Sequence, residues 1–398
     1  LQRARRLAPD DPRLDYEMAL QFLTESDPEE ALRYAERAAI GAPGTLAYAQ
    51  LETDLQFSLG HPNDALDAAL RASTHDGAPP ATRRLLASAQ ARMGDREQAL
   101  ITLKRAARAA DFNAVELHAI AELQMSLGDF QSAASVLDTA LKGDANYLPV
   151  KRALIQAEIG LGNAAKALEM AEEMAEARPD DALQRLLLGE AAMAAKKYRT
   201  ALAAFDRAEA LGANDTAIIG QIDALQAQNR SEDAQRRMAT YVNNGGQQPE
   251  IRGRYSDLLI RAGEWSNALP VLEKLAADYP DVPTVINNLA VVQHALGDTQ
   301  AVQTARRALE LAPDQAYTND TLGWILFETG EPSEALGYLR EATTRAAQDP
   351  GMRYHLAATL AALGREAEAR EELKQALATE REFGDHGAAR ALLEQLGG

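Results

Sequence analysis

An alanine that returns every 34 residues constrains the fold of this chain more than any other feature of its sequence. It occurs eleven times, and the spacing is 34 residues everywhere except at two steps of 33. The eleven positions are Ala31, Ala65, Ala99, Ala133, Ala167, Ala201, Ala234, Ala268, Ala301, Ala335 and Ala369. Chance does not keep one register over so many copies, so the chain is predicted to be an array of one repeated supersecondary unit.

Other small residues keep the same register. A small residue precedes the alanine by twelve positions in most units, as at Ala19, Gly189 and Gly323. A glycine also lies shortly before the alanine in most units, where it can end one helix in a left-handed cap before the next begins. Apolar residues at three- and four-residue spacings, such as Leu322 and Leu326, predict amphipathic helices. Each unit is therefore predicted to be a pair of helices that must stack on its neighbours to bury its apolar face.

The segment from Thr321 to Pro350 carries this pattern most completely and resembles a tetratricopeptide repeat. The residues that carry the resemblance are Leu322, Gly323, Trp324, Gly330, Glu334, Ala335 and Ala342. The resemblance extends over nearly the whole chain, as about eleven units of 34 residues. It implies an all-α fold, a right-handed α–α superhelix (a solenoid) in which the first helix of each unit lines a concave groove.

A narrower resemblance covers the chain from Asn287 to its C-terminus. It rests on four runs, Asn287–Ala290, Asp320–Leu326, Arg353–Ala357 and Ala388–Leu393. These runs are similar to the last repeats of tetratricopeptide proteins of the PEP-CTERM system, which are bacterial cell-envelope proteins tied to exopolysaccharide export and protein sorting. The resemblance implies a scaffold for protein or peptide partners that is periplasmic or associated with the outer membrane rather than cytoplasmic. Two alternatives stay open: a periplasmic protein that binds polysaccharide, and a cytoplasmic assembly adaptor.

The repeat register also predicts how the chain is organised. Residues 1–11 are expected to be the end of a preceding repeat, since the chain begins at Leu1 inside an expected helix, and we expect it to be part of a longer protein. Units 1–7 are expected at 12–246, units 8–11 at 247–383 and a capping helix at 384–398. The run Asn-Asn-Gly-Gly-Gln-Gln-Pro at 243–249 favours turn conformations. It predicts either a hinge or a slightly longer loop between repeats.

Composition excludes several functions. The net charge of −18, without a basic cluster, disfavours nucleic acid and anionic membranes as partners. No apolar stretch approaches the roughly 20 residues of a transmembrane helix, so no membrane insertion is expected. The chain has no cysteine, and none of its histidines has another at the three- or four-residue spacing that suits zinc on a helix. No nucleophile elbow or phosphate-binding loop occurs. We therefore predict no enzyme activity and no catalytic, cofactor or metal site.

One stretch near the C-terminus stands out as a candidate binding surface. Aromatic residues make up only 5% of the chain, yet Tyr317, Trp324 and Phe327 follow one another at spacings of seven and three, on one helical face. Aromatic side chains beside polar ones are typical of binding hot spots. If the groove geometry of related repeats holds here, the groove of the last units presents eight residues. They are Asn287, Val291, His294, Tyr317, Asp320, Trp324, Phe327 and Tyr354. The alternative is that these aromatic side chains pack between neighbouring helices.

Overall fold

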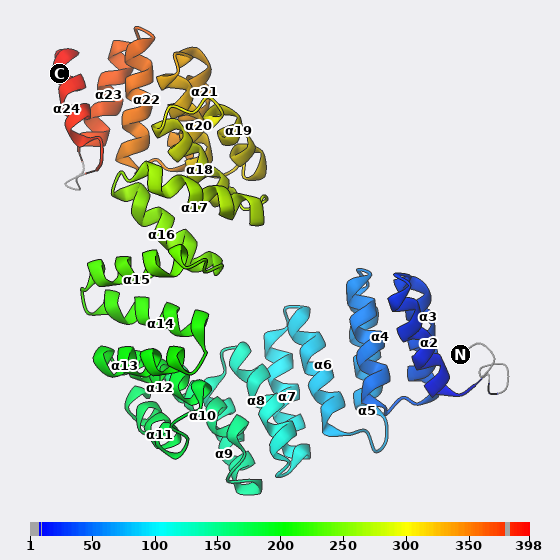
Figure 1. Cartoon of the computed structure of the whole chain (residues 1–398). Helices are drawn as coiled ribbons and strands as arrows, with labels where there is room; N and C mark the ends of the chain where they lie inside the picture. The colour runs from blue at the N-terminus through cyan, green and yellow to red at the C-terminus, as the bar shows by residue number, and fades with distance from the viewer. Residues whose placement is uncertain (1–7, 9, 379–382) are drawn as a thin grey trace. The chain divides into compact units, whose positions relative to one another are not determined.

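The computed structural model describes residues 8, 10–378 and 383–398, and in these residues it contains 23 α-helices and no β-strand (Figure 1). The expected helix end at residues 1–7 and 9 lies outside the described residues. The helices alternate as the first and second helix of successive hairpins, and the eleven alanines lie in the second helices. The prediction of an all-α array of repeats is confirmed.

Contacts divide the chain into two compact units, Leu1–Ala224 and Leu225–Gly398, and the division falls within α14. The described part of unit 1 stacks seven first helices with six second helices. The first helices are α2 (Pro12–Thr24), α4 (Leu46–Ser58), α6 (Pro80–Arg92), α8 (Ala114–Ser126), α10 (Leu148–Gly160), α12 (Ala182–Ala194) and α14 (Asn214–Ala227). The second helices are α3 (Pro28–Gly41), α5 (Pro62–Thr74), α7 (Arg96–Ala110), α9 (Phe130–Gly143), α11 (Ala164–Ala177) and α13 (Tyr198–Ala210).

Unit 2 continues the alternation. After the last residues of α14, its first complete helix is the second helix α15 (Ser231–Asn243). Its four first helices are α16 (Pro249–Arg261), α18 (Pro283–Ala295), α20 (Ala316–Glu328) and α22 (Pro350–Ala362). Its other second helices are α17 (Trp265–Asp278), α19 (Ala301–Leu311), α21 (Pro332–Arg345) and α23 (Glu366–Leu377). The last helix, α24 (His386–Gln395), packs on α22 and α23. In the described part of both units, no helix is long and apolar enough to cross a membrane.

The turn inside each hairpin has the left-handed residue that the glycines predicted. Eight glycines at this place have positive φ values, between 70° at Gly263 and 93° at Gly330. The three units without glycine adopt the same conformation, at Ser26 (φ 61°), Lys196 (φ 57°) and Asn229 (φ 58°). The residue that follows the left-handed residue donates its N–H to a backbone carbonyl of the preceding helix, as Asp95 does to the Gln90 carbonyl at 2.9 Å. This bond satisfies one of the free carbonyls at the helix end.

The core lies between adjacent helices and is built on the small residues. The eleven alanines of the repeat are all at most 2% exposed. Where a first helix carries glycine instead of a larger residue, a bulky side chain of the second helix fills the space. A Cβ atom on Gly323 would lie 2.6 Å from Leu339 Cγ, and one on Gly189 would lie 2.4 Å from Phe205 Cε1. The small positions therefore let the helices approach closely, as the sequence predicted.

The loop 243–249 is held by local hydrogen bonds. The Gln248 N–H donates to the Tyr241 hydroxyl at 3.0 Å, and the Arg252 guanidinium donates to the Gly246 carbonyl at 2.7 Å. Helix α15 ends before this loop at Asn243 and α16 begins after it at Pro249. A hinge at this loop stays a prediction.

Candidate binding pocket on the first helices of unit 2

The successive first helices α18, α20 and α22 pack against one another in unit 2. A pocket of about 680 Å³ opens on their shared face. It is lined by Val291, His294, Ala295, Asp320, Thr321, Trp324, Ile325, Glu328 and His355, and we call it the Trp324 pocket. Three neighbouring repeats contribute to it, so the pocket exists only because the repeats stack in register.

Trp324 is the largest side chain of the pocket, and other rings hold it in place. Its ring stacks on His355, with centroids 4.1 Å apart and planes at 22°, and on Phe327 at 5.1 Å. Tyr354 is tilted against it at 5.9 Å. Each aromatic pair contributes about 0.5–1.5 kcal/mol beyond the burial of its area. Trp324 is only half-buried and lines the pocket, so part of its fixed ring remains exposed there.

Two histidines bridge neighbouring repeats in the pocket. His294 of α18 lies 2.5 Å from Glu328 of α20, measured from Nε2 to Oε2. His355 of α22 lies 2.8 Å from Asp320 of α20, and its other ring nitrogen lies 3.6 Å from a carboxylate oxygen of Asp385. These pairs join α18, α20, α22 and the start of α24 by polar contacts.

The two carboxylates decide the charge of His355. Burial of the imidazole lowers its pKa, but the hydrogen bonds and charges of Asp320 and Asp385 more than compensate and raise the pKa of His355 to about 9. The hydrogen bond from His355 in turn lowers the pKa of Asp385. His355 is therefore a cation at neutral pH, stacked on Trp324 and flanked by two carboxylates.

The structure places the eight predicted groove residues in three environments. Val291, His294, Asp320 and Trp324 line the pocket. Phe327 and Tyr354 contact the Trp324 ring from outside the pocket lining.

The other two predicted residues do not line the pocket. Tyr317 is half-buried two turns before Trp324 on α20, and burial raises its pKa. Asn287 is only 6% exposed, and its Oδ1 accepts no hydrogen bond from the described part of the chain. Asn287 thus belongs to the interior of the stack.

Sequence reasoning did not select His355 or Glu328. A signal for His355 was present, because it lies 35 residues after Asp320, one repeat plus one residue, at the equivalent stretch of the next first helix. Residues about one repeat apart can lie side by side on first helices that pack against each other, as α20 and α22 do. The same reasoning applies to His294 and Glu328, which are 34 residues apart.

An all-helical stack of hairpins, in which each repeat packs only on its neighbours, defines the class of α-solenoid repeat proteins. Two family models described as tetratricopeptide repeat match the chain, one at residues 124–191 and 326–396 and the other at residues 219–283 and 255–316. The matched segments cover more than half of the chain. The chain belongs to the tetratricopeptide repeat family, whose repeats mediate protein–protein interaction.

Two solved structures are similar to this chain at low identity. The chain is 14% identical to one in the crystal structure of the APC/C hetero-tetramer Cut9–Hcn1, with a TM-score of 0.43, over 99% of this chain and 91% of that one. It is 22% identical to MamA 41-end from Desulfovibrio magneticus RS-1, with a TM-score of 0.35, over 41% of this chain and 93% of that one. No curated protein matches the chain.

Proposed function

We propose that this chain is a non-catalytic scaffold that binds protein partners on the first helices of unit 2, with the Trp324 pocket as the anchor. One observation carries the proposal. A half-buried tryptophan is fixed by three neighbouring rings at the edge of a 680 Å³ pocket that three repeats build together. A rigid aromatic residue with polar groups around it is what protein interfaces use as a hot spot.

We further propose that the partners belong to a bacterial cell-envelope machine that exports exopolysaccharide or sorts proteins. The support is the similarity of the runs Asp320–Leu326 and Arg353–Ala357 to the last repeats of such proteins. These two runs carry Asp320, Trp324, Tyr354 and His355, which form the aromatic and charged part of the Trp324 pocket and its surroundings. The resemblance and the pocket therefore rest on the same residues.

Site-specific photo-crosslinking in the native host tests the proposal. A photoreactive phenylalanine analogue is placed at Thr321, which lines the pocket, and in a matched variant at Gly337, which is exposed on the second helix α21. We expect a protease-sensitive adduct at position 321, identified by mass spectrometry as a cell-envelope protein, and no such adduct at position 337.

Other outcomes would contradict parts of the proposal. An adduct that resists protease and is removed by glycoside hydrolases would show that the pocket binds polysaccharide. If the crosslinked protein is cytoplasmic, the proposed scaffold function stands, but the proposed location in the cell envelope is refuted. Equal adducts at positions 321 and 337 would refute the pocket as the binding site.

A further inference from the structure

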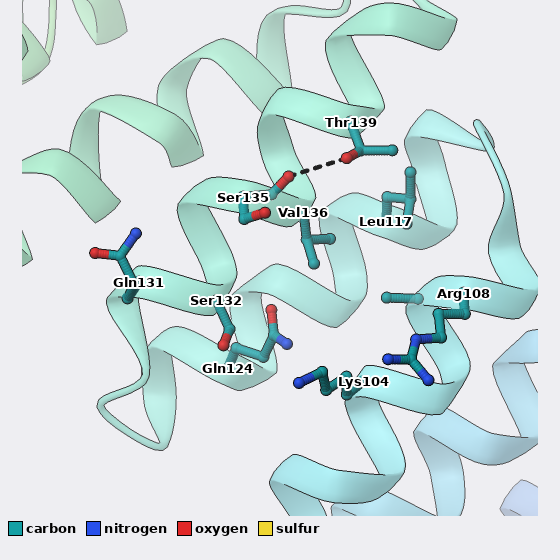
Figure 2. A pocket seen from close by; sticks show the side chains of 10 residues that line it. Lys104, Arg108, Leu117, Gln124, Gln131, Ser132, Ser135, Val136 and Thr139 are labelled. Carbon is teal, nitrogen blue, oxygen red and sulfur yellow. Dashed lines mark hydrogen bonds between the residues drawn. The ribbon is translucent and has the colours of Figure 1, made fainter.

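A second pocket lies in unit 1 on a different face of the repeats. It has a volume of about 490 Å³ and lies between the second helices α7 and α9, over the first helix α8 (Figure 2). We call it the Lys104 pocket. Its lining includes Lys104 and Arg108 of α7, Leu117 and Gln124 of α8, and Ser135 and Val136 of α9. The pocket is thus built by two consecutive repeats and shares no residue with the Trp324 pocket.

The α7 side of the pocket carries uncompensated positive charge. Lys104 and Arg108 are exposed, stand one helical turn apart, and form no ion pair with the described residues. Like charges at this spacing destabilise a helix, and Arg105 adds a third cation to the same turn. In a chain with a net charge of −18, this local field favours an anionic ligand.

The floor of the pocket holds the buried side-chain amide of Gln124. Gln124 is 2% exposed, and its Oε1 accepts no hydrogen bond from the residues that the structure describes. In Figure 2 its amide and the Lys104 ammonium point toward the same space. A buried acceptor without a donor is costly and is uncommon in folded proteins.

The preceding repeat shows which hydrogen-bond donor the Gln124 oxygen lacks. There Gln90 occupies the position that Gln124 has one repeat later, and its Oε1 accepts a hydrogen bond from the Thr102 hydroxyl at 2.8 Å. The residue 34 positions after Thr102 is Val136, which has no hydroxyl. Replacement of threonine by valine therefore frees the Gln124 acceptor and adds an apolar wall at the same point of the pocket.

We propose that the Lys104 pocket binds an acidic peptide segment of a partner protein. A carboxylate of the peptide pairs with Lys104 and Arg108, a backbone N–H donates to Gln124 Oε1, and an apolar side chain packs on Leu117 and Val136. A simple anion would use the two cations but would leave the amide oxygen and the apolar wall without partners. The site extends the proposed function, because it lies on second helices of unit 1 and works independently of Trp324.

Fluorescence anisotropy with the intact chain tests the site. The probe is a labelled short peptide of alternating Glu and Leu, and the comparison peptide has Gln in place of every Glu. We expect the acidic peptide to bind more tightly and to lose affinity as salt is added, because the pairs are partly exposed. Lys104→Glu should weaken binding about fivefold, whereas Arg105→Glu, which changes the net charge equally outside the pocket, should weaken it less than about twofold.

A second variant separates the amide from the charges. Val136→Thr restores the donor that Thr102 provides to Gln90, so it should satisfy Gln124, raise the thermal stability of the chain and weaken the acidic peptide about fivefold. Trp324→Ala should leave the peptide affinity unchanged. The proposal is overturned if the Gln peptide binds as tightly as the Glu peptide. Equal losses in Lys104→Glu and Arg105→Glu, or full affinity in Val136→Thr, would overturn it as well.

Discussion

The charge of His355 gives a prediction that can be tested at a single pair of side chains. In an unfolded chain the pKa of a histidine is about 6.5, and in the pocket the pKa of His355 is about 9. A difference of about 2.5 pKa units corresponds to about 3 kcal/mol. Because the folded pKa is the higher one, this stabilisation is fully present below pH 6.5 and is lost as the pH rises through 9.

Trp324 fluorescence reports this titration, since the two rings are 4.1 Å apart. The chain has two tryptophans, so Trp265→Phe leaves Trp324 as the only source of the signal. A protonated imidazole quenches indole emission more than a neutral one, and we expect the emission to rise with a midpoint at about pH 9. Asp320→Asn should lower the midpoint of this transition by roughly 1–3 pH units, because it removes the negative charge nearest to the His355 imidazolium.

The control is His355→Gln, which should abolish the transition. Burial raises the pKa of Tyr354 above its usual value of 10, so a signal from this neighbouring ring would come at higher pH and would survive in His355→Gln. A midpoint near 6.5 in the parent chain, or an unchanged midpoint in Asp320→Asn, would refute the reasoning. Either result would mean that the two carboxylates do not hold the proton on His355.

Two further predictions concern stability and are measured by thermal or chemical denaturation. Gly323→Leu should cost roughly 1–3 kcal/mol or more, because even a Cβ there lies 2.6 Å from Leu339 Cγ; Gly337→Ala, a helical glycine with open space around it, should instead gain up to about 1 kcal/mol. Lys196→Gly should gain about 1 kcal/mol by removing a side chain from a left-handed residue, and Gly94→Lys should lose as much at the equivalent turn. Equal changes in the free energy of unfolding for the two glycine variants of the helices would contradict the packing argument. Equal changes for Lys196→Gly and Gly94→Lys would contradict the turn argument.

The repeat architecture could be predicted because its physical causes are local. Each feature recurs at a fixed position of the 34-residue repeat: the small residues at helix crossings, the glycines in the turns and the helical spacing of apolar residues. The turns at Ser26, Lys196 and Asn229 have no glycine, although all three residues have positive φ. Asparagine is the residue that tolerates this conformation best after glycine, so residue type could have indicated the turn at Asn229. At Ser26 and Lys196 only the repeat register indicated a turn.

The candidate sites were predictable only where a residue type is rare. Trp324 and Phe327 were found because aromatic residues are scarce in the chain and these two share one helical face. His355 and Glu328 were missed because their role depends on which residues of the next repeat they meet. The Lys104 pocket could not be predicted from the sequence, because Lys104 and Arg108 resemble ordinary surface charges. The structure shows that Gln124 lacks the hydrogen bond that a threonine gives Gln90 one repeat earlier, since Val136 takes the place of that threonine.

The role of the Trp324 pocket as the partner's anchor is tested by measuring how tightly tryptophan variants of the chain bind the partner identified by photo-crosslinking. Trp324 lies in the pocket, whereas Trp265 packs against the cluster around Leu272 on the second helix α17. We expect Trp324→Ala to weaken binding by about 2 kcal/mol or more, roughly thirtyfold, and Trp265→Ala to leave the affinity within about twofold. Equal affinities of the parent chain and Trp324→Ala would contradict the claim that this pocket anchors the partner.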